Sequence, residues 1–178
     1  TSALRHALEP ELPDKFLSRY LKVDNEVIKL VLPPGSIVDF VNFEREIPNA
    51  LITKNYDLLR RYLSDYTGDL FPMDLYADWS VARREHLIQL YRQGMLALAQ
   101  WYLENSQPLA ALESAQMIIQ QDPWNEEAVQ ITMLAYANMN NIPHAIYAYM
   151  QLEKTLREDL DLVPRADLRE LAQALKQR

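Results

Sequence analysis

The sequence has 178 residues, a length that suits one ordinary domain or one domain with a fragment of another. Its net charge of −7 and its lack of cysteine exclude a strongly basic nucleic-acid binder, a disulfide scaffold and a thiolate zinc site. The longest nearly unbroken apolar run, Met95–Leu103, is far shorter than the roughly 20 residues of a membrane span. Because the chain opens on Thr1 without a leader-like segment, we expect a cytoplasmic protein and a piece of a longer one.

Residues 1–48 precede the strongly helical part of the sequence. The segment Thr1–Leu8 favours a short helix, and the β-prone runs 16–23 and 27–32 predict a hairpin. The residues alone leave open whether this hairpin is a small structural ribbon or a functional element. With 6 basic and 8 acidic residues, this part has a net charge of −2. That balance lacks the basic surplus of a self-sufficient DNA-binding unit.

After residue 48 the apolar side chains recur at helical spacing. Residues 50–66 are amphipathic at this spacing, and residues 78–104 form a long helical pattern without proline. Gly94 lies within the apolar stripe of that pattern, where glycine costs about 1 kcal/mol relative to alanine. We therefore expect Gly94 to let another helix approach closely.

Between these two patterns lies the connector, residues 66–79, with the sequence YTGDLFPMDLYADW. Gly68 predicts a turn that a side chain would obstruct, and Pro72 prevents the helix from continuing. We expect Tyr76 and Trp79 to be buried and to pin the connector onto the first helices. The alternative is that these two aromatic side chains form part of a partner surface.

The C-terminal part repeats itself with a period of 34 residues. Tyr136 follows Tyr102 by 34 positions, and Ala145 follows Ala111 by the same interval (136 − 102 and 145 − 111). This is the period of the tetratricopeptide repeat, a pair of helices in which the aromatic residue fills the space between them. The alanine lets the second helix lie against the first. Each pair leaves an apolar face uncovered, so we expect the preceding helices and a last helix, 165–177, to cover the open ends.

The connector also carries a family resemblance. Together with ARREHLIQLY at 82–91, its sequence resembles the bacterial transcriptional activator domain of SARP-type regulators. In that class a helical-repeat module follows a winged-helix DNA-binding domain. The segment VDFVNFE at 38–44 is similar to the entry of that module, and residues 159–175 are similar to its closing element. The resemblance thus runs from about residue 38 to the C-terminus.

The resemblance also gives residues 1–36 an interpretation. In this family a recognition helix ends in a leucine- and arginine-rich segment and precedes a two-stranded wing. ALRHALEP at 3–10 and the hairpin at 16–32 occupy those places. The resemblance therefore implies a remnant of a winged-helix DNA-binding domain at 1–36 and an activator domain at 37–178. The predicted fold class is mainly α, a TPR-like right-handed helical repeat (α–α superhelix) with a short N-terminal β-hairpin.

Nothing in the sequence predicts an active site, a metal site or a cofactor. The three histidines are isolated, and none has a second histidine or a cysteine at ligand spacing. Three glycines cannot form a phosphate-binding loop. The acidic residues of the connector lack the spacing of a calcium loop, so we expect solvated caps and turns at Asp69, Asp74 and Asp78. We predict that the protein is not an enzyme.

The resemblance implies the regulatory domain of a bacterial transcriptional activator, acting by protein–protein contact and oligomerisation. Its partner would be a second copy, RNA polymerase or another domain of the same chain. DNA would bind only through a complete winged helix, and we predict neither membrane binding nor a small-molecule substrate. The candidate partner surface, whose polarity equally suits a solvated face, comprises Gln100, Glu104, Gln130 and Asn138. The DNA-contact candidates are Thr1, Arg5 and Lys22. The alternative is a TPR-type scaffold or adaptor without a DNA role.

Overall fold

A computed structural model describes residues 2–13, 16–25 and 27–177 of the chain. The chain forms two compact units, Thr1–Asp39 and Phe40–Arg178. The DNA-contact candidate Thr1 lies outside the described residues.

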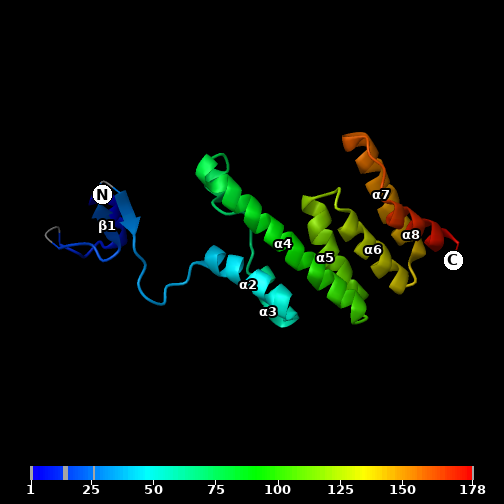
Figure 1. The fold of residues 1–178 in the computed structure, drawn as a ribbon, viewed down its shortest axis with the longest axis horizontal. Coiled ribbons are helices and arrows are strands. Elements are labelled where there is room, and N and C mark those ends of the chain that lie inside the picture. The colour runs from blue at the N-terminus through cyan, green and yellow to red at the C-terminus, as the bar shows by residue number, and fades with distance from the viewer. Residues whose placement is uncertain (1, 14–15, 26, 178) are drawn as a thin grey trace. The chain divides into compact units, whose positions relative to one another are not determined.

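The first unit contains a short helix and a β-hairpin (Figure 1). Its elements are α1 (Ser2–Leu8), β1 (Leu21–Asp24) and β2 (Val27–Leu30). The strands are antiparallel, with Leu21 opposite Leu30, so the predicted hairpin is confirmed with shorter strands than predicted. Asn25 has a φ of 45°, the left-handed conformation that tight hairpin turns require and that asparagine tolerates.

A buried carboxylate ties the end of α1 to the segment before β1. The Glu9 side chain, only 4% exposed, accepts hydrogen bonds from the Ser18 hydroxyl and from the Arg19 backbone N–H at 3.1 Å. The Arg19 Nε donates to it as well, at 3.1 Å. The Ser18 hydrogen bond, followed by those from Arg19, lowers the pKa of Glu9 below the ordinary glutamate value, although burial opposes this. No pattern in the sequence predicted this role of Glu9.

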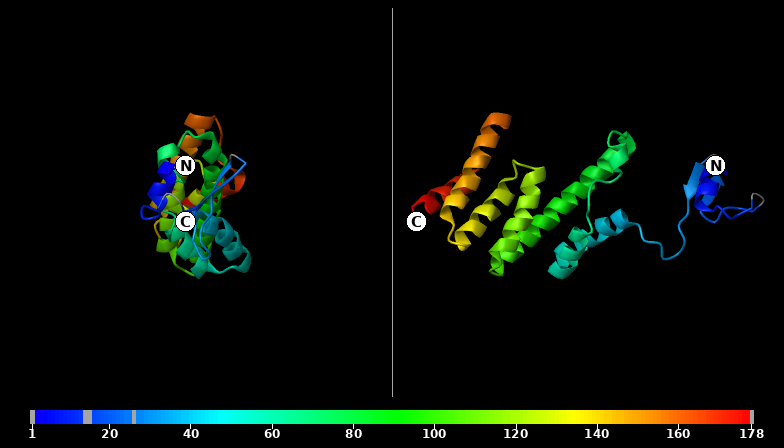
Figure 2. Two further views of the ribbon diagram at one scale, coloured as in Figure 1. Left: turned by 90° about the vertical axis from the view of Figure 1, so that its left-hand side faces the viewer. Right: turned by 180° about the vertical axis from the view of Figure 1, so that it is seen from behind.

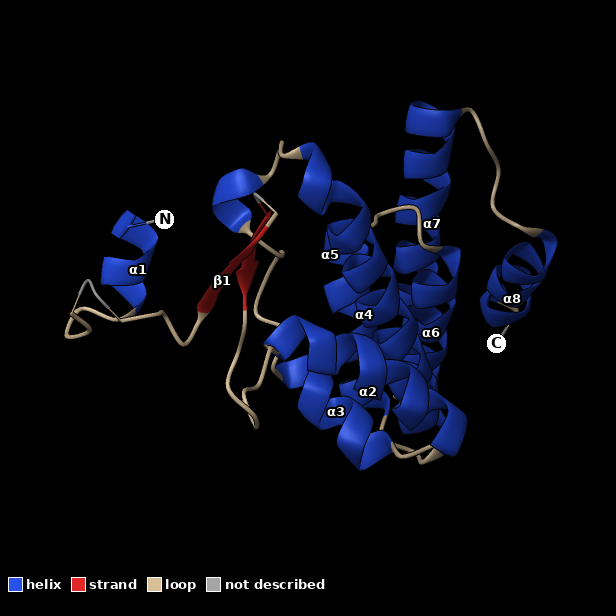
Figure 3. Cartoon of the chain, turned by 60° about the vertical axis from the view of Figure 1, so that its left-hand side comes forward, coloured by secondary structure: helices blue, strands red, loops and turns tan. Residues whose placement is uncertain are grey.

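The second unit is built of helices, drawn in blue in Figure 3. They are α2 (Asp39–Thr53), α3 (Tyr56–Ser64), α4 (Asp78–Glu104), α5 (Pro108–Gln121), α6 (Glu126–Asn138), α7 (Ile142–Leu160) and α8 (Ala166–Lys176). A single 3-10 turn, Pro72–Asp74, lies in the connector. The mainly α class with an N-terminal hairpin is thus confirmed, and α4 has the predicted bounds.

Helices α4 to α7 stack in chain order, from green to orange in Figure 2. The pairs α4–α5 and α6–α7 correspond to the two 34-residue repeats. Tyr102, Ala111 and Ala145 are buried, whereas Tyr136 is half-buried. Helix α3 packs on α4, and α8 packs on α7 and α6, so both ends of the paired helices are covered as predicted.

Buried apolar side chains form two clusters within this unit. The first extends from α2 to α6, and the second from α6 to α8. Ile119 of α5 and Tyr136 of α6 pack against both clusters. These two residues therefore mark the boundary between the clusters.

Gly94 allows α3 to approach α4 closely, as predicted. A Cβ added at Gly94 would lie 2.9 Å from Leu63 Cδ2 and 3.3 Å from Leu59 Cδ1, both in α3. These distances are shorter than ordinary carbon–carbon contacts, so the missing side chain makes room for the leucines.

The start of the helical unit differs from the prediction. The sequence predicts helical spacing only from residue 50, yet α2 begins at Asp39 and continues through Pro48. A proline inside a helix costs about 3 kcal/mol. Helix α2 nevertheless forms because three of its apolar side chains are buried in the first cluster, those of Phe43, Ile47 and Ala50.

The amphipathic segment 50–66 is also divided into two helices. Lys54 has a φ of 52°, which ends α2, and the Asn55 side chain accepts a 3.0 Å hydrogen bond from the Leu58 N–H. Asparagine is a favoured residue at this capping position, so α3 starts as a separate helix.

Candidate interaction surface

A buried arginine anchors the connector. The guanidinium of Arg84 in α4 belongs to a side chain that is 8% exposed. It donates to the carbonyl oxygens of Leu70 (3.0 Å), Asp74 (3.1 Å) and Leu75 (2.7 Å) and to the hydroxyl of Ser80 (2.9 Å). The five N–H donors of a guanidinium suit several acceptors at once. Sequence reasoning missed this residue because an arginine in a helix is usually solvated.

The large apolar side chains of the same segment are exposed instead. We call Phe71, Met73, Leu75, Tyr76 and Trp79 the apolar ledge. The rings of Phe71 and Trp79 lie 5.1 Å apart between centroids. Phe71 has a φ of 51°, a left-handed conformation that is uncommon for a large side chain. Surrounding contacts must hold the backbone in this conformation, in agreement with the anchoring by Arg84.

The expectation that Tyr76 and Trp79 are buried is wrong. Tyr76 is 96% exposed and Trp79 is 69% exposed. The connector is attached through its backbone carbonyls, so these two side chains are not needed to hold it. Tyr66, in contrast, packs against the first cluster, with its ring centroid 4.6 Å from that of Tyr91 and 5.2 Å from that of Phe43. Burial raises the pKa of Tyr66.

Gly68 and Pro72 both shape the backbone of the connector. A Cβ added at Gly68 would meet no atom within 4 Å, so a clash with neighbouring atoms is not what requires glycine there. What distinguishes the position is its φ of 158°, which residues with a side chain rarely adopt. Pro72 starts the 3-10 turn of the connector, because its fixed φ suits the first residue of a helical turn.

The charge near the ledge is negative. Asp69, Asp74 and Asp78 are exposed, as expected for turn and cap residues. Of the two arginines at the start of α4, Arg84 is buried, and Arg83 donates to both Glu44 carboxylate oxygens at 2.7 and 2.8 Å. The hydrogen bond from Arg83 lowers the pKa of Glu44. A partner approaching the ledge therefore meets apolar surface flanked by carboxylates.

Comparison with known proteins assigns the family. The family described as "Bacterial transcriptional activator domain" matches residues 38–176. The chain belongs to this family. No curated protein sequence matches the chain.

A solved structure supports the fold of this activator domain protein. "Mycobacterium tuberculosis EmbR in complex with low affinity phosphopeptide" is similar with a TM-score of 0.73 and 20% sequence identity. The likeness covers 99% of this chain and 48% of that chain. The present chain therefore spans about half the length of the EmbR chain.

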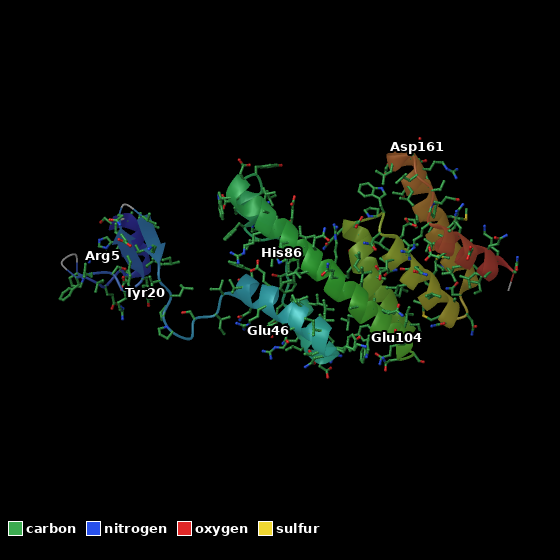
Figure 4. The ribbon with its side chains drawn as sticks, in the orientation of Figure 1. Arg5, Tyr20, Glu46, His86, Glu104 and Asp161 are labelled. Atoms are coloured by element: carbon green, nitrogen blue, oxygen red, sulfur yellow. The ribbon has the colours of Figure 1, made fainter. Side chains whose placement is uncertain are left out.

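The polar residues predicted as the partner surface of the activator domain have different surroundings. Gln100 and Glu104, the latter labelled in Figure 4, are exposed near the end of α4, and Gln100 Nε2 donates to Glu104 Oε1 at 3.1 Å. Asn138 is exposed at the end of α6. In contrast, Gln130 accepts a 2.6 Å hydrogen bond from Arg165 Nη2. The connection between α7 and α8 thus occupies Gln130, which makes it a poor partner residue.

The described DNA-contact candidates lie in the first unit. Arg5, labelled in Figure 4, is half-buried, and its Nη2 donates to the Pro13 carbonyl at 2.6 Å. Lys22 is exposed in β1 and lies opposite Lys29 of β2 in the register of the hairpin. The hairpin therefore carries two adjacent cations on one pair of positions.

The part of the chain that the structure describes contains neither a candidate metal site nor a candidate membrane span. No group of three or more histidine, cysteine, aspartate or glutamate residues there could hold a metal ion. His86, labelled in Figure 4, and His144 are both exposed. Within the same described part, none of the helices is both apolar and long enough to cross a membrane.

Proposed function

We propose that this chain is the regulatory part of a bacterial DNA-binding transcriptional activator and that it acts by binding other proteins. The observation that carries the proposal is the apolar ledge on a member of this family. Tryptophan, tyrosine and methionine are enriched in protein interfaces, and exposed apolar patches with polar rims mark interaction sites. Oligomerisation through this surface is one form of the contact.

The anchoring by Arg84 favours this use of the ledge. Binding normally costs free energy because loops and side chains must be ordered. Three hydrogen bonds from one buried side chain to the connector's carbonyl oxygens already hold the connector in place. The flanking carboxylates favour a partner that surrounds an apolar centre with lysine or arginine. A second copy, RNA polymerase and another domain of the same protein are the partners to test.

The first unit provides the link to DNA in this proposal. We assign residues 1–36 to the end of a recognition helix and the wing of a winged-helix domain, and residues 37–178 to the activator domain. DNA would bind through the complete winged helix, to which Arg5 and Lys22 would contribute phosphate contacts. This role places the protein in the cytoplasm, and it requires no enzymatic step.

The ledge is tested in the full-length protein with the double substitution Tyr76→Ala and Trp79→Ala. Truncating interface hot spots costs about 2 kcal/mol or more, so we expect partner affinity to fall about 30-fold or more. Genome-wide DNA occupancy should persist while transcription from the occupied promoters falls. Co-precipitation of a differently tagged copy and of RNA polymerase identifies which contact is lost.

The matched control for this experiment is Ile52→Ala with Met150→Ala, which removes two exposed apolar side chains outside the ledge. The control should activate transcription as the unmodified protein does. Normal activation and normal partner capture by the ledge variant would refute the proposed role of the ledge.

The DNA role is tested by replacing Arg5 and Lys22 with glutamine in the full-length protein. Each lost phosphate contact lowers the slope of log affinity against log salt concentration by about 0.9. The double variant should therefore show a slope smaller by up to about 2. An unchanged slope would contradict a DNA-facing first unit.

A further inference from the structure

A groove of about 350 Å³ lies between α5 and α7, over α6. Its floor includes the buried side chains of Val129 and Thr132 from α6 and Leu152 from α7. Its rim includes the exposed side chains of Gln116 and Tyr147. The groove arises because α5 and α7 both pack on α6. Its lining contains no residue of the apolar ledge.

The lining of the groove is mostly apolar and carries no aspartate, glutamate, lysine or arginine. Its polar groups are hydroxyl, amide and imidazole side chains. Burying an ion without a partner of opposite charge costs much free energy. The lining therefore suits an uncharged occupant.

One polar atom in the floor lacks a partner. The Thr132 side chain is 4% exposed, and its Oγ1 makes no hydrogen bond to any described residue. Buried hydroxyl groups almost always have a hydrogen-bond partner, because leaving one unpaired is unfavourable. A polar atom of a bound molecule would satisfy this hydroxyl.

We propose that this groove binds a small, uncharged, largely apolar organic molecule with one hydrogen-bonding group that pairs with Thr132 Oγ1. Its volume lies within the range of ligand pockets, about 300–1,000 Å³. A second copy of the chain would need about 800 Å² of surface on each partner, and the groove's lining is far smaller than that.

The position of the groove gives the binding a structural consequence. Ile119 and Tyr136 line the groove and pack against both hydrophobic clusters of the helical unit. A molecule bound there contacts the side chains that join the clusters, so it stabilises their packing and raises the melting temperature. The sequence, from which we predicted no small-molecule substrate, gave no sign of this site.

The experiment compares two probes, 2-acetylnaphthalene and 2-naphthoate, which share a ring system and differ in charge. Amide signals of the isotope-labelled protein are followed by NMR during titration. The neutral ketone should bind saturably and shift the signals of Thr132, Ala148 and their neighbours. The anion should bind at least about tenfold more weakly, because the lining offers no lysine or arginine.

Substitutions locate the binding. Thr132→Val removes the hydroxyl and should weaken ketone binding by about threefold to tenfold, the value of one hydrogen bond. Ala148→Leu fills the groove and should abolish binding, whereas Ala174→Leu, at an exposed position of α8, should leave it unchanged. If Ala148→Leu does not fold, Gln116→Trp blocks the groove from its exposed rim.

Four results would overturn the proposal. They are a lack of saturable shifts up to the solubility of the ketone, equal affinity for the anion, normal binding by the groove-blocking variant, and shifts confined to the apolar ledge. Ledge variants that lose partner binding while still binding the ketone would separate this site from the proposed protein contact.

Discussion

Replacing Arg84 with methionine should release the connector. The side chain makes four hydrogen bonds, and each one to a charged group contributes about 1.5–3 kcal/mol. Two effects make the loss of stability smaller than the sum of these four contributions. Burying the guanidinium itself costs several kcal/mol, and the exposed connector can open so that water reaches its carbonyls. We therefore expect the free energy of unfolding to fall by about 2–4 kcal/mol.

Urea denaturation followed by helical circular dichroism measures this loss, and hydrogen exchange locates it. The amides of Asp74, Ala77 and Ser80, which bond to carbonyls of residues 71, 74 and 77, should exchange faster in the variant. The neighbouring substitution Arg83→Met is the matched control. It breaks an exposed ion pair and should cost about 1 kcal/mol or less. A loss below about 0.5 kcal/mol for Arg84→Met, with unchanged exchange, would show that the arginine does not anchor the connector.

Three further changes test other parts of the fold. Gly94→Val should destabilise the protein by about 1–3 kcal/mol in urea unfolding because the valine side chain collides with Leu63. Gly94→Ala should cost less because alanine favours the helix. A stabilising effect of valine would contradict the close packing of α3 on α4. Asn125→Ala should cost about 1 kcal/mol in thermal unfolding by removing the cap of α6, and Asn125→Asp should be nearly neutral. Because Arg83 holds the pKa of Glu44 below its ordinary value, their pairing contributes stability above that value and loses it as pH falls through the lowered pKa. Unfolding measured from neutral to acidic pH should show a weaker pH dependence for Glu44→Gln, and an unchanged dependence would contradict this role.

Local signals in the sequence predicted most of the helices correctly. The uninterrupted periodicity of residues 78–104 matches α4, and the prolines at 108 and 143 lie in the first turns of α5 and α7. Asn125, a residue type favoured at helix N-caps, accepts a hydrogen bond from the Ala128 N–H with its side chain. These features depend on residues within one or two helical turns, so they are visible in a single sequence.

Features that depend on distant contacts were not predicted. Helical spacing is predicted only after residue 48, but burial of Phe43, Ile47 and Ala50 keeps α2 continuous through Pro48. Glu9 and Arg84 looked like ordinary charged residues, yet both are buried among groups 9–14 positions away in the sequence. Only the tertiary fold brings these hydrogen-bond partners together.

The sequence by itself determined the helical repeat, because the spacing of Tyr102, Ala111, Tyr136 and Ala145 records how each helix pair packs. The tertiary structure decided which side chains remain exposed for binding. Hydrophobicity alone placed Tyr76 and Trp79 inside, whereas the hydrogen bonds to the connector's carbonyls hold the backbone so that both side chains face solvent. The groove over α6 likewise depends on how three helices pack, since a single sequence records the residues of its lining but not the space between them.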